Sequence, residues 1–285
     1  MTRPLTTRAR GLAAAAALTL LAACSAEAPS GRDASASPSG STSTSAGPTP
    51  TTAAEPPRPP SPACYDLDYD QAVKPTTDAD PVRCGARHAS TTFFVGEADS
   101  VVNGHLAAVD SDRVQRQIAR ACPRRLPGFL GTTPRELRLS MLRAIWFSPS
   151  IEASDAGANW FRCDVIALAD DRQLAPLQGP MRGVLRTPAA RERYGVCGTT
   201  KPGTPRFRRV ICARPHTWRA IDSFDGPAGR YPGPARLRSI GEDVCRAAAR
   251  SRAENSLDYQ WAMDWPTREQ WREGQRWGLC WAPDA

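Results

Sequence analysis

The stretch Val210-Ile211-Cys212-Ala213-Arg214-Pro215-His216 repeats an earlier one, Val82-Arg83-Cys84-Gly85-Ala86-Arg87-His88. Both contain the pattern Val-x-Cys-x-x-x-His. A second pair of stretches matches at a constant spacing of 117 residues: Pro149-Ser150-x-Glu152, Gly157, Trp160 and Cys163 precede Pro266-Thr267-x-Glu269, Gly274, Trp277 and Cys280. Because these rarer residue types agree in the same order, the chain contains a duplicated unit, which predicts two domains of one fold. We place the first copy at 64–170, a linker at 171–189 and the second copy at 190–285.

Each copy carries four cysteines at matching places. Even numbers of matched cysteines are typical of disulfides in an oxidising compartment. Four cysteines allow three pairings, and the sequence alone does not choose among them. Pairing first with second and third with fourth is favoured because it closes two local loops. The cysteines are Cys64, Cys84, Cys122 and Cys163 in the first copy, and Cys197, Cys212, Cys245 and Cys280 in the second.

The third cysteine of each copy falls in a segment with helical periodicity. In the second copy, apolar residues recur at helical spacing from Leu237 to Ala248, and Ser239-x-x-Glu242 has the form of a capping box that opens a helix. In the first copy the same periodicity covers 110–120. Each copy is therefore expected to bury its third cysteine under one helix.

Extended segments surround these helices. Alternating apolar residues predict strands at 257–265 and 137–147, although Thr133-Pro134-x-Glu136 is also a helix start. The fourth cysteines fall on expected strands at 160–168 and 276–281, and shorter extended runs flank the histidines at 91–96 and 206–213. Each copy is predicted to be a small disulfide-stapled antiparallel sheet packed by one helix, which is an α+β fold.

The N-terminus predicts export. Three arginines precede an apolar run at 11–23, which suits the core of a signal peptide but is too short to span a bilayer. Small residues then lead directly to Cys24, which is the pattern of a bacterial lipobox. We therefore expect a signal peptide at 1–23, cleavage before Cys24 and a lipid anchor on its sulfur. The alternatives are an ordinary secretory signal with Cys24 in a disulfide, and an uncleaved anchor.

Residues 24–63 are built almost wholly from Ser, Thr, Pro, Ala and Gly. Such a segment cannot bury enough apolar surface to fold, so we expect a disordered tether. The expected location is the extracytoplasmic face of the cytoplasmic membrane. The formal charge of +8 becomes +5 once the three arginines of the signal peptide are removed. With no basic cluster or nucleic-acid motif, we expect this charge to face lipid or wall polymer, and we expect no nucleic-acid partner.

The histidines admit three uses. Cys84, His88, Cys212 and His216 would form a Cys2His2 metal set if the two copies faced each other. Cysteine with histidine is also a nucleophile–base pair in some wall peptidases, but a disulfide-bonded cysteine offers no thiolate. We favour the third use, in which His88 and His216 fix turns by bonding to the backbone, with ligand contact as the alternative. We expect no catalytic residue, metal or cofactor.

Six of the eight tryptophans lie in the second copy. Trp265 and Trp271 flank an expected loop, where they are candidate contacts for a glycan or protein, or alternatively fold onto the sheet. The first copy has Ser154 where the second has Trp271. Trp160 and Trp277 occupy matching positions and are expected in the core.

The order Val-x-Cys-x-x-x-His, helix cysteine, Pro-[Ser/Thr]-x-Glu, Gly and strand cysteine resembles the actinobacterial septum-formation domain. Tyr231-Pro232-Gly233 and Trp271-x-x-Gly274 fit that pattern in the second copy. The family pattern has an acidic or amide residue three positions after the histidine. Thr91 and Arg219 hold those places here, which argues against a His–carboxylate pair. The resemblance implies a tethered envelope protein linked to division-site assembly, without a defined biochemical activity.

These observations predict a non-enzymatic lipoprotein that binds or scaffolds in the cell envelope. Its expected partners are the membrane, through the lipidated cysteine, and an envelope or division protein or a wall polymer. One alternative is a small-ligand or metal-binding receptor acting through the two Cys-x-x-x-His motifs. The other is a cell-wall hydrolase.

Overall fold

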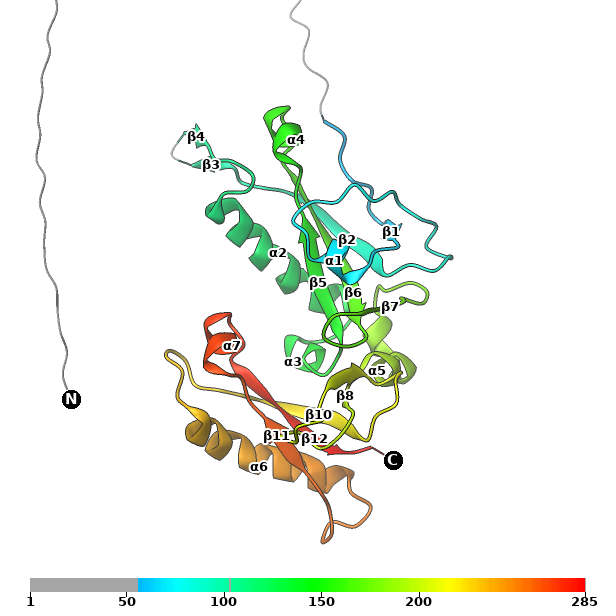
Figure 1. Ribbon diagram of the computed structural model, residues 1–285, viewed down its shortest axis with the longest axis vertical. Helices are drawn as coiled ribbons and strands as arrows, with labels where there is room; N and C mark the ends of the chain where they lie inside the picture. The colour runs from blue at the N-terminus through cyan, green and yellow to red at the C-terminus, as the bar shows by residue number, and fades with distance from the viewer. Residues whose placement is uncertain (1–55, 103, 285) are drawn as a thin grey trace, which may run out of the picture. The chain divides into compact units, whose positions relative to one another are not determined.

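Two five-stranded antiparallel sheets carry the fold of the computed structural model, which describes residues 56–102 and 104–284 (Figure 1). The predicted α+β class and tandem arrangement are confirmed. The expected signal peptide, Cys24 and most of the tether lie outside the described residues. Among the helices that are described, none combines the length and the apolar character needed to cross a membrane.

The sheet of the first copy has the strand order β1-β2-β6-β5, with β7 pairing β6. The sheet of the second copy has the order β8-β10-β12-β11, with β9 added beside β8. The two orders agree strand for strand. The strands of the first sheet are β1 (Cys64–Tyr65), β2 (Ser90–Glu97), β5 (Leu142–Phe147), β6 (Trp160–Leu168) and β7 (Leu174–Ala175). Those of the second are β8 (Val196–Gly198), β9 (Arg209–Ile211), β10 (Trp218–Asp225), β11 (Ala262–Asp264) and β12 (Trp277–Pro283).

The two copies also share an irregularity. The pairing of β2 with β6 shifts register between Thr92 and Phe94, and the pairing of β10 with β12 shifts between Ala220 and Asp222. An extra residue therefore sits at the same place in each copy, Phe93 in one and Ile221 in the other. A bulge of this kind re-aims a side chain and bends the strand.

One 19-residue helix covers each sheet, α2 (Asp112–Leu130) in the first copy and α6 (Pro234–Arg252) in the second. The periodicity at 110–120 covers only the first part of α2, which continues to Leu130. Buried residues continue at every fourth position from Val114 to Leu130, and this face keeps the helix intact through Pro123 and Pro127. The predicted capping box at Ser239 is wrong, because the helix already begins at Pro234, whose fixed φ suits a first turn.

Shorter elements resolve the remaining expectations. Residues 133–147 contain both predicted structures, since the capping box of Thr133 and Glu136 opens the short helix α3 (Pro134–Leu137), and β5 follows it. The predicted strand at 257–265 is limited to β11, and Leu257 is exposed. The other short elements are α1 (Tyr69–Ala72), β3 (Val101–Val102), β4 (His105–Leu106), α4 (Ile151–Asp155), η1 (Val184–Arg186), α5 (Pro188–Tyr194) and α7 (Arg268–Arg272).

The two copies share one core. A single cluster of buried apolar residues runs from Leu126 and Leu142 to Trp218 and Trp281. The expected linker, 171–189, contributes to it, burying Leu177, Met181 and Leu185. Backbone hydrogen bonds join the copies as well, from Met141 N to Tyr194 O at 2.7 Å and from Ile211 N to Ala169 O at 3.0 Å.

Candidate functional site

The eight cysteines of the two copies form four disulfides, and the pairing is the one that closes local loops. Cys64 bonds Cys84 and Cys122 bonds Cys163. In the second copy Cys197 bonds Cys212 and Cys245 bonds Cys280. The helix cysteines Cys122 and Cys245 thereby tie α2 and α6 to the central strands of their own sheets. The remaining cysteine, Cys24, lies outside the described residues.

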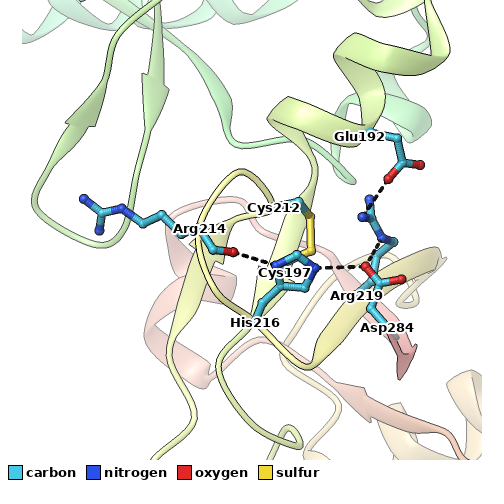
Figure 2. The surroundings of a disulfide bond; sticks show 7 residues. All are labelled: Glu192, Cys197, Cys212, Arg214, His216, Arg219 and Asp284. Atoms are coloured by element: carbon cyan, nitrogen blue, oxygen red, sulfur yellow. Dashed lines mark hydrogen bonds and ion pairs between the residues drawn. A yellow bond between two sulfur atoms is a disulfide. The ribbon is translucent and has the colours of Figure 1, made fainter.

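A histidine lies beside the Cys197–Cys212 disulfide, between two oxygen atoms (Figure 2). The His216 Nδ1 is 2.6 Å from the Arg214 carbonyl oxygen, and its Nε2 is 2.9 Å from Oδ2 of Asp284. A carbonyl and a carboxylate only accept hydrogen bonds. Each ring nitrogen therefore faces an acceptor, and the ring is held from both sides.

Asp284 is the centre of a small charged network. Its Oδ2 also accepts a hydrogen bond from Arg219 Nε at 2.6 Å, and Arg219 Nη2 lies 2.7 Å from Glu192 Oε2. Burial alone would raise the pKa of the Asp284 carboxyl. The hydrogen bonds from His216 and Arg219, together with their charges, outweigh burial and hold this pKa below its usual value. The carboxylate therefore stays ionised and fixes the histidine ring.

The first copy keeps the histidine but not the carboxylate. The His88 ring makes the same turn contact, from Nδ1 to the Ala86 carbonyl oxygen at 2.9 Å. Its Nε2 is buried without a hydrogen-bond partner in the described part of the chain. By the spacing of the final strands, Ala167 holds the place of Asp284. Both histidines thus make the backbone turn contact expected of them. The expectation, drawn from Thr91 and Arg219, that a His–carboxylate pair is absent is wrong for the second copy, and within the described residues it holds for the first.

A buried ion pair marks the first copy instead. Arg162 and Asp164 flank Cys163 on β6, are 4% and 0% exposed, and lie 3.0 Å apart from Nη2 to Oδ2. Ser90 and Thr92 donate hydrogen bonds to the carboxylate at 2.7 and 2.8 Å. Burial raises the pKa of Asp164, and the Arg162 charge opposes that rise. The guanidinium also stacks on Tyr65, 3.9 Å from the ring centre.

Sequence reasoning missed this pair, although a signal existed. Two opposite charges two residues apart in the apolar strand Trp160–Leu168 point to one face, and a charge there needs a partner. The second copy has Leu279 and Trp281 at the same two places, and both are buried. The ion pair in the first copy and the apolar pair in the second copy fill the same two buried positions.

The disulfides leave the cysteines of the two Cys-x-x-x-His motifs without a thiolate for a metal. The ligand atoms of Cys197, Cys212 and His216 lie within 4.8 Å of one another, but the two sulfur atoms are bonded to each other. The Cys2His2 metal set considered between the copies also lacks its cysteine ligand from the first copy, because Cys84 is bonded to Cys64. A bonded sulfur provides no thiolate for a metal or for nucleophilic attack.

Of the two alternatives for Trp271, ligand contact or packing against the fold, the structure shows packing. Its side chain is 2% exposed, its indole N–H donates to the Gly229 carbonyl oxygen at 3.0 Å, and Tyr231 packs edge-on against it. Trp265 is half-buried under Arg238, whose guanidinium lies 5.3 Å from the ring centre. Trp160 and Trp277 are also half-buried rather than fully enclosed. The tryptophan-rich end of the second copy therefore serves packing.

Two proteins of Mycobacterium tuberculosis, from strains CDC 1551 / Oshkosh and ATCC 25618 / H37Rv, are similar to part of this chain. Each is 31% identical over 101 residues, and each is described as an uncharacterized membrane protein. The aligned part is 30% of this chain and 22% of each relative, so the chain spans less than a quarter of the length of the curated relatives it matches. No family model and no solved structure matches the chain.

Proposed function

We propose that the protein is a non-enzymatic lipoprotein, anchored through Cys24 to the extracytoplasmic face of the membrane, that binds or scaffolds in the cell envelope. The observation that carries this proposal is the division of the nine cysteines. Eight form disulfides, and the ninth follows directly on the small residues of the lipobox. Four disulfides in one chain are typical of an oxidising compartment.

The non-enzymatic part of the proposal is supported by the state of the Cys-x-x-x-His motifs. The cysteines of both motifs are in disulfides, and the His216 ring is held by Arg214 and Asp284. These side chains therefore stabilise turns, and the remaining surfaces are left for binding. The similarity to membrane proteins of an actinobacterium supports a membrane-associated role.

The proposed process is septum formation or wall growth, and it rests on the motif resemblance. The residues that carry this resemblance have structural roles in both copies. Cys84 and Cys212 close the first disulfides, and Trp271 fills the space under Gly226 and Gly229. The proposal is therefore that the motif defines a rigid scaffold, and that the binding surface differs among proteins that carry it.

Metabolic labelling with an alkyne fatty acid tests the anchor. The full chain should be labelled and sediment with membranes, whereas Cys24→Ser should lose both properties and the neighbouring control Ser30→Ala should keep them. In the same samples, alkylation without a reductant should modify none of the other eight cysteines. Two or more reactive thiols would overturn the disulfide account, and a labelled Cys24→Ser protein would overturn the anchor.

Two further measurements test the process. A fluorescent fusion of the full chain should gather at division sites, and an even distribution along the membrane would refute the link with septation. Incubation with purified wall polymer should release no fragments. Release that is lost in His216→Ala would show a hydrolase and overturn the non-enzymatic assignment.

A further inference from the structure

We propose that a groove beside the first disulfide binds a single aliphatic chain that carries an anionic headgroup. The groove, which we call the disulfide groove, has a volume of about 650 Å³. Ligand pockets for small molecules fall in the range of about 300–1,000 Å³ and are mostly apolar. Its walls include Cys64, Cys84, Phe93, Phe129, Met181 and Arg182.

Aromatic side chains from separate elements form the apolar surface of the groove. Phe93 comes from the bulge of β2 and Phe129 from the last turn of α2, and their rings stack with centres 5.1 Å apart. Met181, from the segment that leads to the second copy, also lines the groove. The Cys64–Cys84 disulfide fixes the facing wall. Ser61, Thr91 and Thr92 add three hydroxyls to the lining, but the two phenylalanine rings, Met181, the prolines and the disulfide make it mostly apolar, which suits methylene groups.

The charge at the groove has one sign. Among the residues that line it, Arg182 alone is charged, and its guanidinium lies 5.1 Å from the Phe129 ring centre. Within 56–102 and 104–284, Arg182 makes no ion pair with a carboxylate. An apolar groove with one unpaired cation at its edge complements a chain that ends in a carboxylate or phosphate.

The second copy provides an internal comparison. Arg219, Ala220 and Ile221 hold the places of Thr91, Thr92 and Phe93, and they too line a pocket. That pocket is smaller, about 280 Å³, and its walls include charged residues of both signs, such as Arg191 and Glu192. The residues at the bulge therefore line a pocket in both copies. Only in the first copy is the lining of that pocket mostly apolar.

Binding of saturated fatty acids of increasing length tests the proposal. The probe protein is the full chain carrying Cys24→Ser, so that no detergent is needed, and binding is measured by isothermal calorimetry below the critical micelle concentration. Each added methylene should strengthen binding about fourfold until the groove is full. Primary alcohols of equal length should bind at least tenfold more weakly because they lack the charge that faces Arg182.

Matched variants locate the site. A Cβ on Gly85, which lines the groove, meets no atom within 4 Å, so Gly85→Trp should fill the groove without disturbing the fold and abolish binding. Gly128 is equally open but lies outside the groove, and Gly128→Trp should bind normally. Arg182→Gln should remove the preference for acids over alcohols, whereas Arg193→Gln should preserve it.

A parallel series with lysophosphatidic acids separates the two sources of an anionic headgroup. Binding of the fatty acids alone indicates a free fatty acid, and binding of both series indicates a phospholipid chain as well. Failure of both series to bind, or equal binding by Gly85→Trp and its parent, would overturn the proposal. This outcome is distinguishable from failure of the lipoprotein assignment, because the measurement does not use the Cys24 anchor.

Discussion

His216 and Asp284 are 68 residues apart in the chain, and 2.9 Å separates Nε2 of the one from Oδ2 of the other. The contact fastens the turn after Cys212 to the end of β12. It ties the residues before β10 to the residue after β12 at one end of the second sheet, and the first copy has no equivalent carboxylate.

Asp284→Asn should weaken the protein in a pH-dependent way. The pKa of Asp284 is lowered in the folded state, so its contribution to stability is present at neutral pH and is lost as the pH falls through that folded value, below the ordinary aspartate value of about 3.9. We expect a loss of about 1–2 kcal/mol in the free energy of unfolding at pH 7 and a smaller loss at pH 3. Urea unfolding measures both. The exposed Asp258→Asn is the control, and an equal deficit at the two pH values would contradict the assignment.

Removal of the disulfides should affect stability in the order of the loops they close. The Cys122–Cys163 bridge spans 41 residues and the Cys197–Cys212 bridge spans 15. Chain entropy predicts losses of about 4 and about 3 kcal/mol for the two double alanine variants. Cys122 and Cys163 are both fully buried, whereas Cys212 is 9% exposed, which adds to the larger loss. Denaturant unfolding gives the order, and the reverse order would refute it.

Asp164→Ala should be among the most damaging single changes in the first copy. It leaves the Arg162 charge buried without a partner, which costs about 3–5 kcal/mol. Replacing both residues by leucine should cost less than that, because the second copy packs Leu279 and Trp281 at the same places. A double-mutant cycle in thermal unfolding checks this, and additive losses would exclude the coupling.

Trp271→Ala should destabilise the second copy without acting on a binding surface. Its indole fills the space against Gly226, where an added Cβ would lie 2.8 Å from the ring, and truncation of such a side chain costs about 3–5 kcal/mol. The half-buried Trp265→Ala should cost about 1 kcal/mol, largely from its contact with Arg238. Equal effects of the two substitutions would show that Trp271 is not the structural anchor described here.

The local sequence pattern is enough to predict an element where the burial of that element alone determines its type and its bounds. The strand at 160–168 was predicted with the bounds it has, because its apolar residues leave it no exposed face. The helix over Cys122 was predicted in its first half only. Proline is disfavoured inside a helix, so Pro123 and Pro127 are local signals that the helix ends. The burial of every fourth residue of α2 against the rest of the fold outweighs these signals.

Longer-range relationships could not be predicted from the sequence. Nothing near Asp284 links it to His216, and nothing near Trp271 shows that the 226–229 turn covers its ring. The duplication indicated two units of one fold, but it carried no information on Leu177 and Met181, which join the cores of both copies. The bulge at Phe93 likewise becomes visible only when β6 supplies the register.

The position of Cys64 has a mechanical consequence. It lies in the two-residue edge strand β1, the first strand of the described residues, and it is bonded to Cys84. A pulling force applied through the preceding chain would reach β1 before any other strand, and two residue pairs with β2 would resist it poorly. The covalent bridge passes that force to the 82–88 turn instead, so β1 cannot be peeled away by itself and the folded part should respond to tension as a single body.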